Sequence, residues 1–179
     1  MKKLITLFLI MAFISCNNNK KVDEEKEEQR YTQQSPEIEV MKSAIKDYED
    51  GNWESFASHY AEDAAIYTNS EDSVSVSEII SARRDALKPF DTYRIRTSPD
   101  EYEMVVTDKG ETWVNFWGVW EARITGTSNT VNMPLHITQK YENGKIVKEY
   151  GYYDSGRISS ALSETAAIND SIIASSSEN

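Results

Sequence analysis

The chain has 179 residues and a mass of 20.4 kDa, with 39% hydrophobic and 27% charged residues. This length and balance predict one soluble globular domain with tails, rather than a membrane bundle or a fully disordered chain. The formal net charge of −11 disfavours nucleic acid as a partner, because phosphate backbones carry the same sign. The single cysteine excludes an internal disulfide and a thiolate-rich metal site.

Residues 1–15 have the pattern of a signal peptide. Lys2 and Lys3 give a positive start, and an apolar run from Leu4 to Ile14 follows that is shorter than the roughly 20 residues a membrane span needs. Cys16, directly after a small serine, resembles a bacterial lipobox, in which the thiol is acylated and the chain is cut just before the cysteine. We expect Cys16 to anchor a lipoprotein in the bacterial cell envelope, at the outer membrane. An uncleaved anchor, or a cleaved signal with an idle cysteine, is the alternative.

The next segment, residues 16–34, is expected to be a solvated acidic tether. Val22 is its one aliphatic residue, so the segment cannot bury enough surface to fold. Lysines followed by an acidic run resemble the surface-export signal of lipoproteins in Bacteroidetes-type bacteria. A plain charged spacer is an equal alternative.

Residues 35–160 are expected to form the folded domain, which begins with three helices. Ser35 before Pro36 predicts the start of the first helix, and Asn52 predicts the start of a second. The segment Ser75–Glu78 has the spacing of a capping box, which predicts the third helix.

A run of strands follows the helices. The Asn143-Gly144 pair predicts a tight hairpin between the last two strands. Helices followed by antiparallel strands indicate an α+β domain. Residues 161–179 are rich in Ser and Ala and are expected to form a flexible tail. The expected strands cover 64–67, 91–96, 103–107, 112–124, 130–141 and 145–154.

Two parts of the chain resemble SnoaL-like proteins of the nuclear transport factor 2-like (NTF2-like) superfamily. The segment Gly51–Tyr67 (GNWESFASHYAEDAAIY) is similar to the second helix and first strand of that family. The segments Pro134–His136, Tyr141–Ile146 and Tyr150–Asp154 are similar to its closing hairpin. The resemblance implies a cone-shaped cystatin-like roll, in which a curved, mixed but largely antiparallel sheet packs on three N-terminal helices around a pocket. The superfamily includes polyketide cyclases, a ketosteroid isomerase, dehydratases and non-enzymatic binding domains, so the fold alone does not select a function.

The resemblance to the cyclase branch implies that Asp154 acts as a general base assisted by His136. A carboxylate in an apolar pocket can take a proton from carbon next to a carbonyl. A two-residue turn at Asn143-Gly144 places His136 opposite Gly151, so His136 and Asp154 point to opposite faces unless a β-bulge lies near Gly151. Alternatively, Asp154 ends a strand in solvent and His136 is an ordinary sheet residue.

We expect the pocket to bind a small, mostly apolar molecule without converting it. The alternatives are an isomerase, cyclase or dehydratase that uses Asp154, and a partner domain that dimerises through the sheet. No cofactor is expected, and two isolated histidines give no zinc motif. Trp113 and Trp117 share one face of their strand and Trp120 lies on the other, so one sheet face could be an exposed aromatic surface for a second copy or a ligand. The expected pocket residues are Trp53, Tyr60, Tyr67, Trp117, His136, Tyr150 and Tyr152.

Overall fold

The computed structural model describes residues 30–177, and the side chains of residues 30–170. The expected signal peptide and Cys16 lie outside the described residues, as does most of the expected tether. Within the part of the chain that the structure describes, no helix is both long and apolar enough to cross a membrane.

The three expected helices are present as α1 (Pro36–Glu49), α2 (Trp53–Ser58) and α3 (Val76–Leu87). The Ser35 side chain accepts a hydrogen bond from the backbone N–H of Ile38, and the capping box between Ser75 and Glu78 is complete. These caps satisfy backbone donors that would otherwise have no partner at the helix starts. The second helix is short and ends at Ser58, because Tyr60 already begins a strand.

Seven strands form one sheet in the order β1-β4-β5-β6-β7-β2, and β3 pairs with β5 beside this path. All pairs are antiparallel except β2 with β7, so the sheet is mixed, as predicted. A short 3₁₀ helix at Pro99–Glu101 precedes β4. The strands are β1 (Tyr31–Thr32), β2 (Tyr60–Thr68), β3 (Phe90–Arg96), β4 (Tyr102–Val106), β5 (Thr112–Ile124), β6 (Thr130–Glu142) and β7 (Lys145–Tyr153).

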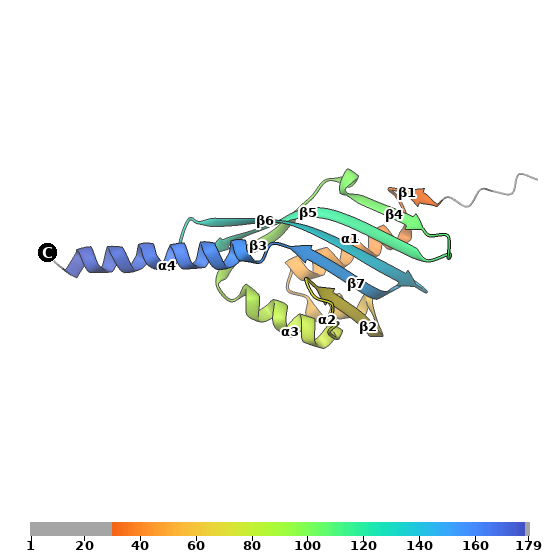
Figure 1. The fold of residues 1–179 in the computed structure, drawn as a ribbon, viewed down its shortest axis with the longest axis horizontal. Coiled ribbons are helices and arrows are strands. Elements are labelled where there is room, and N and C mark those ends of the chain that lie inside the picture. The colour runs from red at the N-terminus through yellow and green to blue at the C-terminus, as the bar shows by residue number, and fades with distance from the viewer. Residues whose placement is uncertain (1–29, 178–179) are drawn as a thin grey trace, which may run out of the picture.

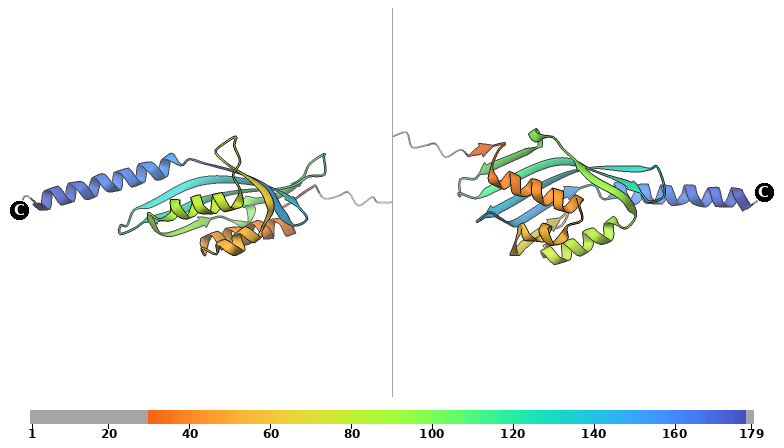
Figure 2. Two further views of the ribbon diagram at one scale, coloured as in Figure 1. Left: turned by 90° about the horizontal axis from the view of Figure 1, so that it is seen from below. Right: turned by 180° about the vertical axis from the view of Figure 1, so that it is seen from behind.

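The helices and the curved sheet form two layers (Figures 1 and 2). Helices α1, α2 and α3 lie on one side of the sheet, which we call the inner face, and the opposite side is the outer face. The buried core lies between the layers and includes Ile38 and Met41 from α1, and Phe116 and Trp120 from β5. This two-layer α+β architecture confirms the predicted fold class.

The register of the β6–β7 hairpin differs from the expected one because of a β-bulge. Tyr141 pairs with Ile146, but Lys140 pairs with Lys148, which leaves Val147 as an extra residue in β7. His136 therefore lies opposite Tyr152 rather than Gly151. A one-residue shift moves every following side chain of the strand to the other face, so the bulge turns Glu149 to the inner face and Tyr150 and Tyr152 to the outer face.

Both ends of the domain are more ordered than the sequence suggested. Tyr31 and Thr32, within the expected tether, form β1 and pair with β4. The expected Ser-rich tail is a helix, α4 (Gly156–Ser177). It runs on from the end of β7 beside β6, where the side chain of Asn129 donates a hydrogen bond to the Thr165 hydroxyl (Figure 1). Packing of Ile158, Ala161 and Leu162 on the core explains why the first part of this stretch does not fray.

Candidate functional site

A cavity of about 140 Å³ lies between the inner face of the sheet and the helices. Its walls are mostly aliphatic and aromatic, with Met41 and Ala44 from α1, Leu135 and Ile137 from β6, and Trp120 from β5. A dry cavity of this size lined by apolar side chains can hold a molecule the size of benzene. The cavity is therefore suited to a small, mostly apolar guest.

The lining of the cavity includes a buried polar network centred on Glu149. The Glu149 side chain is only 2% exposed, and its Oε2 accepts hydrogen bonds from the Tyr60 hydroxyl at 2.6 Å and from Gln139 Nε2 at 2.6 Å. Arg83 Nη2 donates to Glu149 Oε1 at 2.8 Å. The Tyr141 hydroxyl in turn donates to Gln139 Oε1 at 2.6 Å. Such a network can remain buried because each of its members finds a partner.

The electrostatics keep Arg83 charged and the nearby phenols neutral. Burial opposes the charge of Arg83, but the Glu149 carboxylate outweighs it, and the pKa of Arg83 stays above its ordinary value. Burial and the negative charge of Glu149 raise the pKa of Tyr60 well above 10. Burial also raises the pKa of Tyr48 to about 12. At neutral pH the cavity therefore presents one compensated ion pair and uncharged tyrosines.

The network leaves little room for acid–base chemistry at Glu149. Both carboxylate oxygens already accept hydrogen bonds, one of them from a guanidinium. A substrate proton would have to displace one of these donors before it could reach the carboxylate. The guanidinium of Arg83 is also fixed by ring contacts, at 5.1 Å from the Phe56 centroid and 6.0 Å from that of Tyr48.

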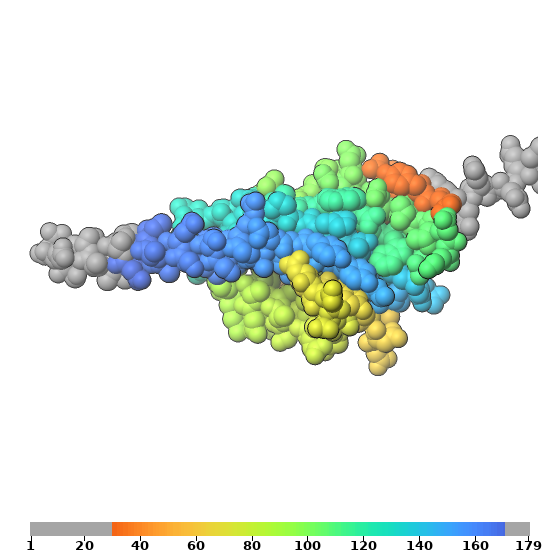
Figure 3. Space-filling model, viewed as in Figure 1, coloured from red at the N-terminus to blue at the C-terminus, as the bar shows by residue number. Residues whose placement is uncertain are grey.

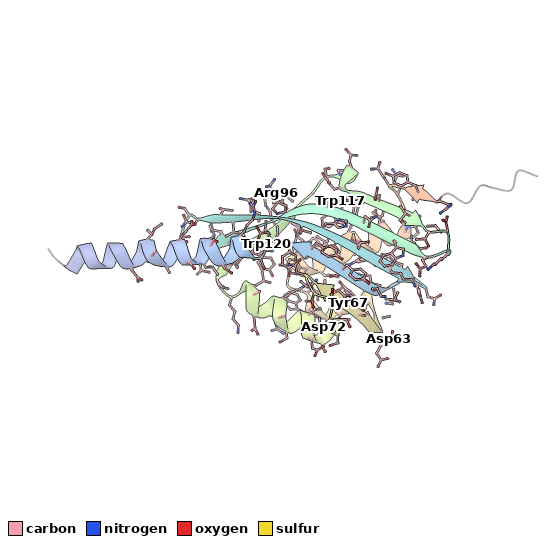
Figure 4. The ribbon with its side chains drawn as sticks, in the orientation of Figure 1. Asp63, Tyr67, Asp72, Arg96, Trp117 and Trp120 are labelled. Carbon is pink, nitrogen blue, oxygen red and sulfur yellow. The ribbon has the colours of Figure 1, made fainter. Side chains whose placement is uncertain are left out.

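The expected pocket residues are divided between the two sides of the sheet. Tyr60 lines the cavity, whereas Trp53 packs edge-on against Tyr48 and Phe56 among the helices. Trp117 and Trp120 come from opposite faces of β5 (Figure 4), and only Trp120 lines the cavity. The remaining expected residues, Tyr67, His136, Tyr150 and Tyr152, form stacked ring pairs on the outer face.

The two expected catalytic residues do not meet in the cavity. His136 stacks on Trp117, and its Nδ1 lies 3.0 Å from the carbonyl oxygen of Phe116. Asp154 follows the end of β7, where its carboxylate accepts a hydrogen bond from the backbone N–H of Gly156 and pairs with Arg157 at 3.5 Å. The Asp154 side chain is 67% exposed, in a shallow polar groove between β6 and α4. Because of the bulge at Val147, His136 and Asp154 fall on the same face when positions are counted along β7. The chain leaves the sheet before Asp154, however, so the shared face does not bring the two side chains together.

Arg83, Gln139 and Glu149 were not predicted from the sequence as cavity residues. Glu149, between Lys148 and Tyr150, is predicted to face solvent when strict alternation is counted from Ile146. Only the bulge brings Glu149 inward, and no residue in that stretch marks the bulge.

The second histidine, His59, lies 2.7 Å from Asp47 Oδ2, and Ser55 donates to the same carboxylate, which fixes the corner between α1 and α2. No group of three or more metal-binding side chains is found among the described residues.

Comparisons with solved structures identify the fold. PrhC from Penicillium brasilianum is 12% identical, with a TM-score of 0.62 over 77% of this chain and 93% of that chain. A Shewanella denitrificans protein named as a SnoaL-like polyketide cyclase is 15% identical, with a TM-score of 0.56 over 73% of this chain and 99% of that chain. A Catenulispora acidiphila protein with a ketosteroid isomerase-like fold, solved in complex with trimethylamine, is 12% identical. Its TM-score is 0.51 over 65% of this chain and 85% of that chain.

The chain therefore has the NTF2-like fold that these proteins share, as its sequence motifs predicted. No family model matches the sequence, and no curated protein matches it. Identities of 12–15% establish the shared architecture and leave the chemistry to the residues of this chain.

Proposed function

We propose that this domain is a non-catalytic binding module whose inner cavity holds a small, mostly apolar molecule. The observation that carries the proposal is the mostly apolar cavity of about 140 Å³, whose lining includes the compensated Arg83–Glu149 pair. Burial of apolar ligand surface would supply most of the affinity. The ion pair would serve to orient a polar atom of the ligand, because Arg83 lines the cavity and its side chain is still 23% exposed.

Cavity filling tests this proposal. Toluene and indole, both close to the cavity in size, should bind the purified protein and raise its melting temperature. Ala44→Phe places a ring in the cavity from α1 and should abolish both effects. Ala82→Phe, on the exposed side of α3, is the matched control and should bind both probes normally. Equal binding by the Ala44→Phe variant, or no binding by the parent protein, would contradict a ligand site in this cavity.

An enzyme of the isomerase, cyclase or dehydratase type that uses Asp154 as base is the alternative. It draws support from the likeness to proteins named as polyketide cyclases. Asp154 is solvent-exposed and engaged by Gly156 and Arg157, however, so the described contacts favour binding over proton abstraction at this carboxylate.

We further propose that the domain is anchored to the bacterial cell envelope through a lipid on Cys16. The support comes from the sequence alone: a positive start, an apolar run of signal-peptide length and a lone cysteine at its end. The acidic segment after Cys16 would then separate the domain from the membrane surface.

A further inference from the structure

The hydrogen-bond acceptors in the lining of the cavity are already occupied by groups of the protein. Both carboxylate oxygens of Glu149 accept hydrogen bonds, and Gln139 Oε1 accepts one from the Tyr141 hydroxyl. The Tyr48 hydroxyl accepts from Trp120 Nε1 at 2.9 Å. A ligand that brings only donors would therefore find no free carboxylate or amide oxygen among the residues that line the cavity.

Donors, in contrast, remain available to a ligand. A guanidinium has five N–H groups, and the described hydrogen bond of Arg83 to Glu149 uses one nitrogen, Nη2. Among the side chains of residues 30–170, no buried nitrogen or oxygen lacks a partner, so the guanidinium nitrogens without one are accessible. Burial raises the pKa of Tyr48 to about 12, which keeps its hydroxyl proton available to donate. The cavity is therefore suited to a ligand that carries an acceptor.

The charges in the lining cancel each other. Of the described residues that line the cavity, only Arg83 and Glu149 are charged at neutral pH, and their closest atoms lie 2.8 Å apart. The Glu149 side chain is only 2% exposed, so water screens this pair weakly. The lining as a whole therefore carries no net charge.

A charged ligand would lose its hydration without gaining a counter-ion. The inner face of the sheet forms one wall of the cavity, and on the other side strands β5, β6 and β7 form the surface of the molecule, so the sheet keeps water away on that side (Figure 3). A carboxylate would bring a second negative charge near Glu149, and an amidinium would bring a second positive charge near Arg83. An uncharged ligand avoids both costs.

We propose that the Arg83–Glu149 pair sets the charge selectivity of the cavity, so that its ligand is an uncharged molecule about the size of one substituted benzene ring with an oxygen acceptor. This inference rests on the binding role proposed above and names the class of ligand. Arg83 and Tyr48 donate to the acceptor. Glu149 determines specificity, because it cancels the charge that would otherwise recruit a carboxylate.

Three probes of one shape test the selectivity on the purified full chain at pH 7. Acetophenone, benzoate and benzamidinium have the same planar arrangement of non-hydrogen atoms, but they carry no charge, a negative charge and a positive charge. Titration calorimetry gives their affinities, and thermal unfolding gives the matching shifts in melting temperature. We expect benzoate and benzamidinium to bind at least about 10-fold more weakly than acetophenone.

Glu149→Gln should reverse the preference. It leaves the guanidinium of Arg83 without its counter-ion, so benzoate should bind at least about 10-fold more tightly than to the parent chain and raise the melting temperature of the variant. Adding Arg83→Met should remove this gain, because the cation that recruits benzoate is gone. Glu71→Gln, at an exposed position after β2, is the matched control for the loss of one negative charge and should keep the parent preference.

The outcomes separate this inference from the proposed function. A parent chain that binds toluene but takes benzoate as tightly as acetophenone would overturn the charge selectivity alone. A parent chain that does not bind toluene would contradict the cavity as a ligand site altogether. A folded Glu149→Gln variant that gains no affinity for benzoate, or an equal gain in the double variant, would also overturn the selectivity. If Glu149→Gln does not fold, the three probes on the parent chain remain decisive.

Discussion

Glu149→Gln is the most direct test of the polar network in the cavity. The substitution keeps the shape of the side chain but leaves the guanidinium of Arg83 without its counter-ion in a largely buried position. Removing one partner of a buried ion pair costs about 3–5 kcal/mol. Arg83 is 23% exposed, and the new amide can still accept one hydrogen bond, so we expect a loss near the lower end, about 3 kcal/mol.

Urea unfolding followed by circular dichroism measures this loss. For a chain of this length, about 3 kcal/mol should lower the melting temperature by roughly 6–12 °C. The slope of the urea transition should stay the same, because the folded structure exposes no additional surface.

A second substitution tests whether the loss of stability in Glu149→Gln comes from the unpaired charge of Arg83 or from a packing defect. Adding Arg83→Met to Glu149→Gln removes the uncompensated cation and should recover about 2 kcal/mol of the stability lost by the single variant. A loss of less than about 1 kcal/mol in Glu149→Gln, or a double variant no more stable than Glu149→Gln alone, would contradict a buried charge left without its counter-ion.

Two further predictions concern Asp154 and Cys16. Asp154→Asn should leave the fold and toluene binding unchanged, because an amide oxygen can still accept from the Gly156 N–H; loss of the circular dichroism signal would instead make Asp154 a structural residue. Cys16→Ser should release the protein from the membrane fraction of lysed cells while Asn17→Ser does not, and continued tight membrane association of Cys16→Ser would contradict lipid anchoring.

Local signals in the sequence predicted most of the individual elements correctly. The caps at Ser35 and Ser75 act within one helical turn, and the turn at Asn143-Gly144 adopts positive φ at both residues, as a tight hairpin requires. Interactions of this kind depend on neighbours in the chain, so the residues themselves contain the information. The motifs that resemble SnoaL-like proteins supplied the fold class for the same segments.

The composition of the cavity was decided by tertiary structure. Glu149 faces inward only because Val147 is an extra residue in β7, and that bulge is set by the pairing of β7 with β6 on one side and with β2 on the other. The same shift sends Tyr150 and Tyr152 to the outer face, so these expected pocket residues do not line the cavity. Arg83 reaches Glu149 across 66 residues of sequence.

The sequence by itself thus determined where α1 and α3 begin and where the last hairpin turns, because those positions depend on contacts between near neighbours. Which side chains share a face, and therefore what lines the cavity, depends on strand register. Register is chosen by the packing of whole strands, and a single inserted residue reverses it.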